Sequence, residues 1–132
     1  MKHLLILLTT VVLFGCGNQN NVKMEQTANK QVGTIELVIF KTKPGFTEDE
    51  VIEAARAVNP VVKQFKGYIS RRLARDTDGT WTDMVYWTDE ASATHAAREV
   101  MKSDICQKFF GMIDEQSMVF RHLQPVMDDD PR

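Results

Sequence analysis

Residues 67–87, GYISRRLARDTDGTWTDMVYW, decide the fold that we expect for this chain. Two strand-like runs, 67–75 and 80–87, flank the polar turn sequence DTDG at 76–79, which is a strong β-hairpin signal. A four-residue loop pairs Arg72 with Asp83 and Tyr68 with Trp87 across the hairpin. The stretch therefore predicts two neighbouring antiparallel strands.

Helices and two further strands are expected on either side of this hairpin. Upstream, the apolar run 34–41 predicts a buried strand, and Thr47 with Glu50 forms a capping box that begins a helix. Apolar residues then repeat at helical spacing, with a kink or break expected at Pro60. Downstream, residues 88–102 and 105–114 predict two helices and 117–123 a last strand.

This order of elements predicts an α+β fold with the ferredoxin-like split βαβ arrangement. One antiparallel sheet would carry helices on one face. The strands have large side chains on both faces, so the other face is expected to be apolar and to be covered by a second copy in a homodimer.

The first sixteen residues have the features of an export signal. Lys2 gives a polar start, residues 4–14 an apolar stretch, and Gly15 a small residue before Cys16. The apolar stretch is shorter than the roughly 20 residues of a membrane-spanning helix. The sequence LFGC at 13–16 resembles the bacterial lipobox, and this resemblance implies cleavage before Cys16 and lipidation of its thiol. The alternative is an ordinary cleaved signal that leaves Cys16 as an incidental thiol.

These features divide the chain into four parts. We expect a signal peptide at 1–15, a flexible polar tether at 16–32, one folded domain at 33–126 and an acidic tail at 127–132. The lipid on Cys16 would anchor the protein to a membrane of the bacterial cell envelope. Gly17 after the cysteine favours the periplasmic side of the outer membrane.

Composition excludes several classes of function. The net charge is −2 and lysines and arginines do not cluster, so no nucleic-acid partner is expected. Cys106 has no second cysteine to pair with once Cys16 is lipidated, and it is expected to be a buried thiol. The sequence has no metal-ligand spacing, phosphate loop or nucleophile elbow, so we expect no metal and no cofactor.

Several short motifs resemble the antibiotic biosynthesis monooxygenase-like family over residues 33–126. They are KPG at 43–45, GY at 67–68, VYWTDEA at 85–91 and MKSD at 101–104. The resemblance implies a dimeric α/β barrel, and the family includes cofactor-free oxygenases and haem-degrading enzymes. The haem-degrading members use an asparagine in the first strand, a tryptophan and a histidine. Here Val100 and Phe110 stand at the last two positions and the first strand has no asparagine, so haem degradation by that route is not expected.

One face of the predicted hairpin combines aromatic and charged residues, which is typical of a pocket for a flat aromatic ligand. It consists of Tyr68, Ser70, Arg72, Trp81, Asp83, Val85 and Trp87. We expect Arg72 to stabilise an anionic oxygen and Asp83 to orient it, while the aromatic residues bind the ring. The alternative is structural, with Arg72 and Asp83 as a cross-strand ion pair and the tryptophans as core.

Two histidines are further candidates. His122 lies on the same face of the last strand as Phe120, so it is expected to reach the interior as a ligand-binding residue, with a structural role as the alternative. His95 lies opposite the apolar stripe of its helix and is expected to face solvent. The sequence thus predicts either a cofactor-free monooxygenase of a small aromatic or quinone-like substrate, or a non-catalytic ligand-binding or assembly lipoprotein.

Overall fold

The computed structural model describes residues 30–127. The predicted signal peptide, Cys16, most of the tether and most of the tail lie outside the described residues. Within 30–127, no helix has the length and apolar character needed to cross a membrane.

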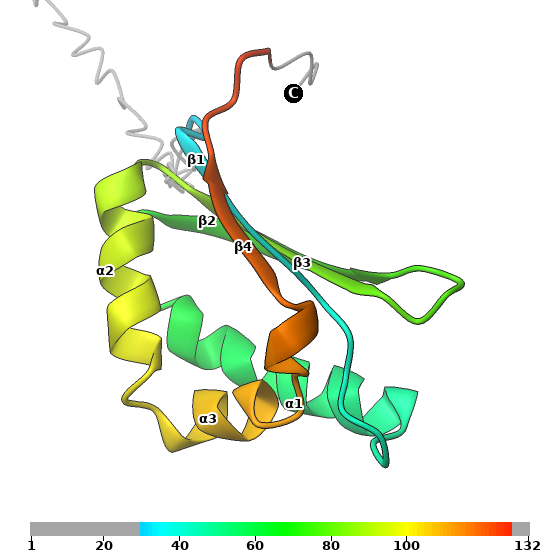
Figure 1. Cartoon of the computed structure of the whole chain (residues 1–132). Helices are drawn as coiled ribbons and strands as arrows, with labels where there is room; N and C mark the ends of the chain where they lie inside the picture. The colour runs from blue at the N-terminus through cyan, green and yellow to red at the C-terminus, as the bar shows by residue number, and fades with distance from the viewer. Residues whose placement is uncertain (1–29, 128–132) are drawn as a thin grey trace, which may run out of the picture.

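Four strands form one antiparallel sheet in the order β2-β3-β1-β4 (Figure 1). The strands are β1 (Thr34–Phe40), β2 (Tyr68–Arg75), β3 (Trp81–Trp87) and β4 (Val119–Leu123). The helices are α1 (Glu48–Val62), α2 (Glu90–Val100), α3 (Asp104–Phe110) and the short 3₁₀ helix η1 (Glu115–Ser117). The predicted ferredoxin-like split βαβ arrangement is confirmed, because β1 lies centrally and pairs with both β3 and β4.

The helices lie on one side of the sheet (Figure 1). Alternate residues of β3 point toward them, and Trp81, Val85 and Trp87 are buried there. Among the described residues, no helix covers the other side of the sheet, which we call the open face. Its apolar members are Ile35, Leu37, Ile39, Met84, Tyr86, Val119 and Leu123.

The hairpin has a different register from the predicted one. Asp76 bonds to Thr80 (N–H to O, 2.7 Å), and Gly79 adopts a left-handed φ of 90°, so only three residues form the loop. Arg75 therefore pairs with Trp81, and Leu73, not Arg72, stands opposite Asp83. A bulge between Tyr68 and Ser70 absorbs the shift, so the predicted pairing of Tyr68 with Trp87 is confirmed.

Helix α1 begins as predicted but does not break as predicted. The Thr47 hydroxyl accepts from the Glu50 N–H (3.3 Å), and the Glu50 carboxylate accepts from the Thr47 N–H (2.8 Å), which completes the capping box. Pro60 does not end the helix, which continues to Val62. Because proline has no N–H, the Arg56 carbonyl one turn earlier lacks the helical donor that another residue at position 60 would supply, and the helix ends two residues after Pro60.

The core consists of two clusters. The larger one joins Phe40, Trp81 and Phe109 to the buried face of α1, and the smaller one joins Trp87 and Ala93 to their neighbours on β3 and α2. A cavity lies between these two clusters.

Candidate functional site

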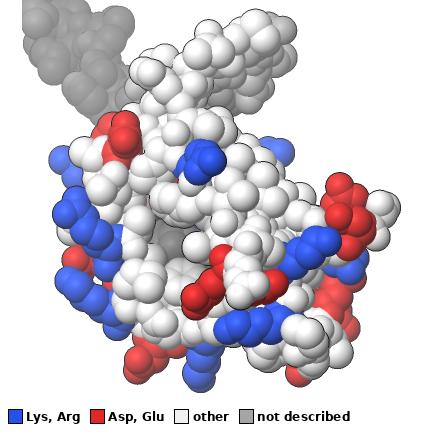
Figure 2. Space-filling model, in the orientation of Figure 1, with Lys and Arg blue, Asp and Glu red and all other residues white. Residues whose placement is uncertain are grey.

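A cavity of about 560 Å³ lies between the sheet and the helices, at the junction of the two core clusters. It exists because Val58 and Val62 of α1 and Ala96 and Ala97 of α2 are too small to fill this space. Figure 2 shows the surface hollowed between the α2 side and the β4 side of this face. Its size falls within the roughly 300–1,000 Å³ of small-molecule pockets.

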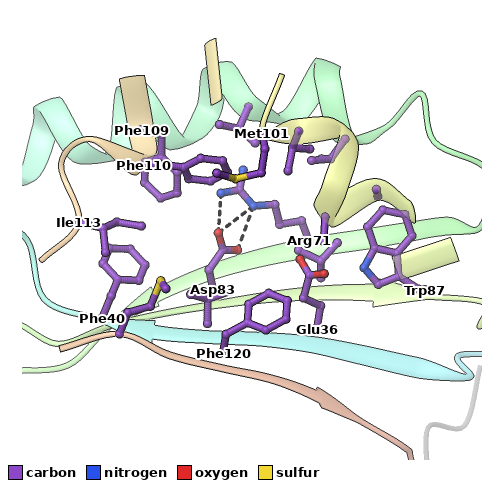
Figure 3. Close-up of a pocket in the computed structure, with 18 of the residues that line it drawn as sticks. Glu36, Phe40, Arg71, Asp83, Trp87, Met101, Phe109, Phe110, Ile113 and Phe120 are labelled. Atoms are coloured by element: carbon purple, nitrogen blue, oxygen red, sulfur yellow. Dashed lines mark hydrogen bonds and ion pairs between the residues drawn. The ribbon is translucent and has the colours of Figure 1, made fainter. Parts of the chain in front are cut away.

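The wall is mainly apolar and aromatic, with a few charged residues (Figure 3). The aromatic members are Phe40, Trp87, Phe109, Phe110 and Phe120, and the charged members are Glu36, Arg71, Asp83 and Glu115. An apolar cavity with few polar groups binds a mostly apolar ligand and orients it by those polar groups.

Arg71 and Asp83 form a buried ion pair at the cavity wall. Their side chains are 5% and 8% exposed, and Arg71 Nη2 lies 2.6 Å from Asp83 Oδ2. Arg71 Nε also donates to Asp83 Oδ1 (2.9 Å), while Nη1 donates to Ala55 O (2.7 Å) and Asn59 Oδ1 (2.9 Å). The guanidinium also lies 5.6 Å from the Phe109 ring centroid. All three guanidinium nitrogens thus donate to protein acceptors, which fixes Arg71 in place.

Glu36 is a second carboxyl at the cavity, with its side chain 13% exposed, and the sequence did not predict it. Its Oε2 lies 3.1 Å from Nε2 of His122, which stands directly opposite on β4. Burial raises the pKa of Glu36, and the nearby charge of Asp83 raises it further, while His122 and Arg71 partly offset this. Alternation along β1 was the available signal, because it places Glu36 on the same face as the buried Phe40.

Trp87 brings an unsatisfied donor to the same wall. The residue is 1% exposed, and its Nε1 is the one buried side-chain N or O atom among residues 30–127 that has no hydrogen-bond partner. Figure 3 shows this nitrogen on the edge of the indole that faces Glu36. Tyr68 packs edge-on against the indole, with ring centroids 5.8 Å apart, and does not line the cavity. Burial raises the pKa of the Tyr68 phenol.

Two predicted site residues lie away from the cavity. Arg72 is exposed and does not line the cavity, so its predicted pairing with Asp83 is wrong. The shifted register places Arg72 on the open face opposite Met84, and Arg71 on the cavity face diagonal to Asp83. Trp81 is buried in the larger core cluster, where its ring stacks on Phe40 at 6.4 Å between centroids. It does not line the main cavity.

The remaining candidates have the following positions. His122 contacts the cavity through Glu36 and is not itself part of the wall. His95 is exposed, as expected, with its ring 6.0 Å from that of Phe65. Cys106 is a fully buried free thiol, also as expected. Within the described part of the chain, no three His, Cys, Asp or Glu side chains are grouped to hold a metal ion.

Comparison with known proteins identifies the fold. No protein-family model and no curated protein sequence matches the chain. Among solved structures, SnoaB, a cofactor-independent oxygenase from Streptomyces nogalater, superposes with a TM-score of 0.63 at 10% identity and covers 77% of this chain and 100% of SnoaB.

Two other solved structures have the same fold. A protein assigned as an antibiotic biosynthesis monooxygenase from Bordetella bronchiseptica gives a TM-score of 0.62 at 19% identity, covering 74% of this chain and 100% of that one. A conserved protein from Methanosarcina mazei gives 0.54 at 17% identity, covering 70% and 93%. The chain therefore has the antibiotic biosynthesis monooxygenase-like fold, and at these identities the likeness shows the fold alone.

Proposed function

We propose that this protein binds a small aromatic or quinone-like molecule in the cavity between sheet and helices and oxygenates it without a bound cofactor. The observation that carries the proposal is the cavity itself, which is large enough for a flat ring system and has aromatic walls with few polar groups. The likeness to SnoaB, a cofactor-independent oxygenase, supports the reaction class. In such a reaction, an electron-rich substrate anion supplies the electrons that reduce dioxygen.

Ligand binding can be tested with a variant that fills the cavity. Hydroquinones, quinones and haem are screened for thermal stabilisation and oxygen consumption. A ligand at about 100 times its Kd stabilises the folded state by about 2.7 kcal/mol. Ala97→Phe places a ring in the cavity and should abolish the effect, whereas Ala91→Phe, exposed on the same helix, should retain it. Equal ligand effects in both variants would place the binding site elsewhere.

A second candidate function, non-catalytic ligand binding, is favoured by the hydrogen bonds of Arg71. This guanidinium donates to Asp83, Ala55 and Asn59, so the ion pair holds the wall together and its nitrogens are already occupied. Thermal stabilisation without oxygen consumption would support this candidate over the oxygenase.

We also propose that the protein works as a lipoprotein of the bacterial cell envelope. The lipobox-like sequence at 13–16 and the polar residues that follow support an acylated Cys16 with a tether to the folded domain. Cys16→Ser should abolish labelling by a radioactive or clickable fatty acid and leave the thermal unfolding of the domain unchanged. Labelling that persists in this variant would exclude Cys16 as the acylated residue, and a wild-type protein that takes up no label would exclude the anchor.

The open face supports a homodimer. It presents Val119 and Leu123, which are 39% and 40% exposed, beside the half-buried Leu37 of the central strand. A second copy would remove this apolar surface from water. We expect the protein to elute as a dimer at micromolar concentration and the Leu37→Lys variant to elute as a monomer. The control variant Glu53→Lys changes an exposed residue of α1 and should remain dimeric. A wild-type monomer would exclude the barrel.

A further inference from the structure

Glu36 and Trp87 lie beside each other on the cavity wall. Glu36 of β1 is paired with Val85 of β3, so Trp87 is its diagonal neighbour on the same face of the sheet. Diagonal neighbours have Cα atoms roughly 7–8 Å apart, a distance that leaves one ligand atom within reach of both side chains. The close-up view shows the carboxyl of Glu36 and the indole nitrogen of Trp87 turned toward each other (Figure 3).

Each of the two side chains has a hydrogen-bonding atom without a partner, a donor on Trp87 and an acceptor on Glu36. The Trp87 N–H has no acceptor, and a buried donor left unpaired costs free energy. The Glu36 carboxyl has one partner, His122, which contacts Oε2 only. A ligand group that gives a proton and also accepts a hydrogen bond would satisfy both, and the hydroxyl is the common group that does so.

We propose that Glu36 and Trp87 form a hydroxyl-binding site in the cavity, where Glu36 accepts the proton of an aromatic hydroxyl and Trp87 Nε1 donates to the oxygen that remains. The ligand O–H bond breaks, its electron pair stays on the oxygen, and the proton passes to the carboxylate. The negative charge thus moves from Glu36 to the ligand, and no other reactant is needed.

This site rests on the proposed oxygenase function and supplies the deprotonation of the substrate that this function requires. Reaction with dioxygen needs a substrate anion, and Arg71 is already bonded to protein acceptors. Burial raises the pKa of Glu36, which makes its carboxylate a stronger base than an exposed one. The N–H of Trp87 would then stabilise the new anion in a place shielded from water.

The neighbours of Glu36 define how the site should respond to pH. The charged or titratable groups near it are His122 on β4, Asp83 on β3 and Arg71 on β2. The residues of α2 that line the cavity are apolar. A loss of hydroxyl binding as pH falls is therefore assigned to protonation of Glu36 if the loss disappears in Glu36→Gln. If the loss remains in that variant, it belongs to another group.

The test compares two probes, 1-naphthol and naphthalene, which share a ring system but differ in the hydroxyl. Their affinities are measured on the purified protein by calorimetric titration. The wild-type protein should bind 1-naphthol about tenfold tighter than naphthalene, as expected for a hydrogen bond to a charged group. The preference should weaken as pH falls through the raised pKa of Glu36, because the carboxylate is then protonated.

Variants separate this site from the cavity as a whole. Glu36→Gln and Trp87→Phe should each lose most of the preference while binding naphthalene within about threefold of wild type. Trp81→Phe is the matched control, since it removes an indole from the same strand outside the cavity, and it should keep the preference.

The outcomes are distinguishable. If neither probe binds the wild-type protein, the proposed ligand class is wrong and this site is wrong with it. If both probes bind but Glu36→Gln and Trp87→Phe keep the preference, or a pH dependence persists in Glu36→Gln, the cavity binds aromatic ligands and only the hydroxyl site is overturned.

Discussion

Replacing Arg71 by methionine should destabilise the protein far more than the same replacement of its neighbour Arg72. Arg71→Met keeps much of the side-chain volume but leaves the Asp83 carboxylate buried, 8% exposed, without its cation. Removing one partner of a buried ion pair costs about 3–5 kcal/mol. A domain of this size has a total stability of about 5–15 kcal/mol, so about a fifth or more of it would be lost.

The assay is thermal and urea unfolding followed by circular dichroism, at one protein concentration for all variants. Each kcal/mol shifts the Tm of a domain of 60–100 residues by about 4–8 °C, so Arg71→Met should lower it by at least about 12 °C. Arg72 is exposed, and Arg72→Met should change stability by no more than about 0.5 kcal/mol.

A double variant separates the ion pair from general damage. Arg71→Met with Asp83→Leu removes both charges, and such apolar replacements are often neutral or stabilising by about 1–4 kcal/mol. It should therefore recover most of what Arg71→Met loses. The reasoning would be refuted if Arg72→Met were the more damaging single change, because the hairpin would then have the register that pairs Arg72 with Asp83.

Other predictions concern pH, backbone geometry and capping. Burial raises the folded-state pKa of Glu36, so between its unfolded and folded pKa the folded protein binds more protons than the unfolded one. The wild-type protein therefore loses stability as pH rises through this interval. The Tm of Glu36→Gln relative to wild type should increase with pH and level off above the raised pKa. Gly67→Ala would place a Cβ 2.5 Å from the Ser92 side chain at a φ of 85°, and it should lower the free energy of unfolding in urea by about 2–4 kcal/mol. Gly45→Ala, at a φ of 99° with no atom within 4 Å of the new Cβ, should lower it by about 1 kcal/mol. Equal costs would exclude the steric contribution at Gly67. Thr47→Ala removes the N-cap of α1 and should cost about 1 kcal/mol, measured as a lower urea midpoint with an unchanged slope.

The sequence by itself determined the elements and their order. Strand and helix periodicities are local properties, and so is the capping box of Thr47 and Glu50 that begins α1. The DTDG turn fixed the position of the hairpin, and the order of elements fixed the split βαβ topology. The burial of Cys106 and the exposure of His95 also followed from local pattern.

Only the tertiary structure decided which side chains form the site. Side chains alternate between the two faces of a strand, so a register shift of one residue moves each side chain to the other face. The hairpin loop, with Gly79 at a positive φ, is one residue shorter than predicted, and Arg71 instead of Arg72 therefore lies beside Asp83. Glu36 and His122 are 86 residues apart, and they meet only because β4 pairs with β1. Register and long-range strand pairing depend on the packing of the whole sheet, which no local stretch of sequence encodes.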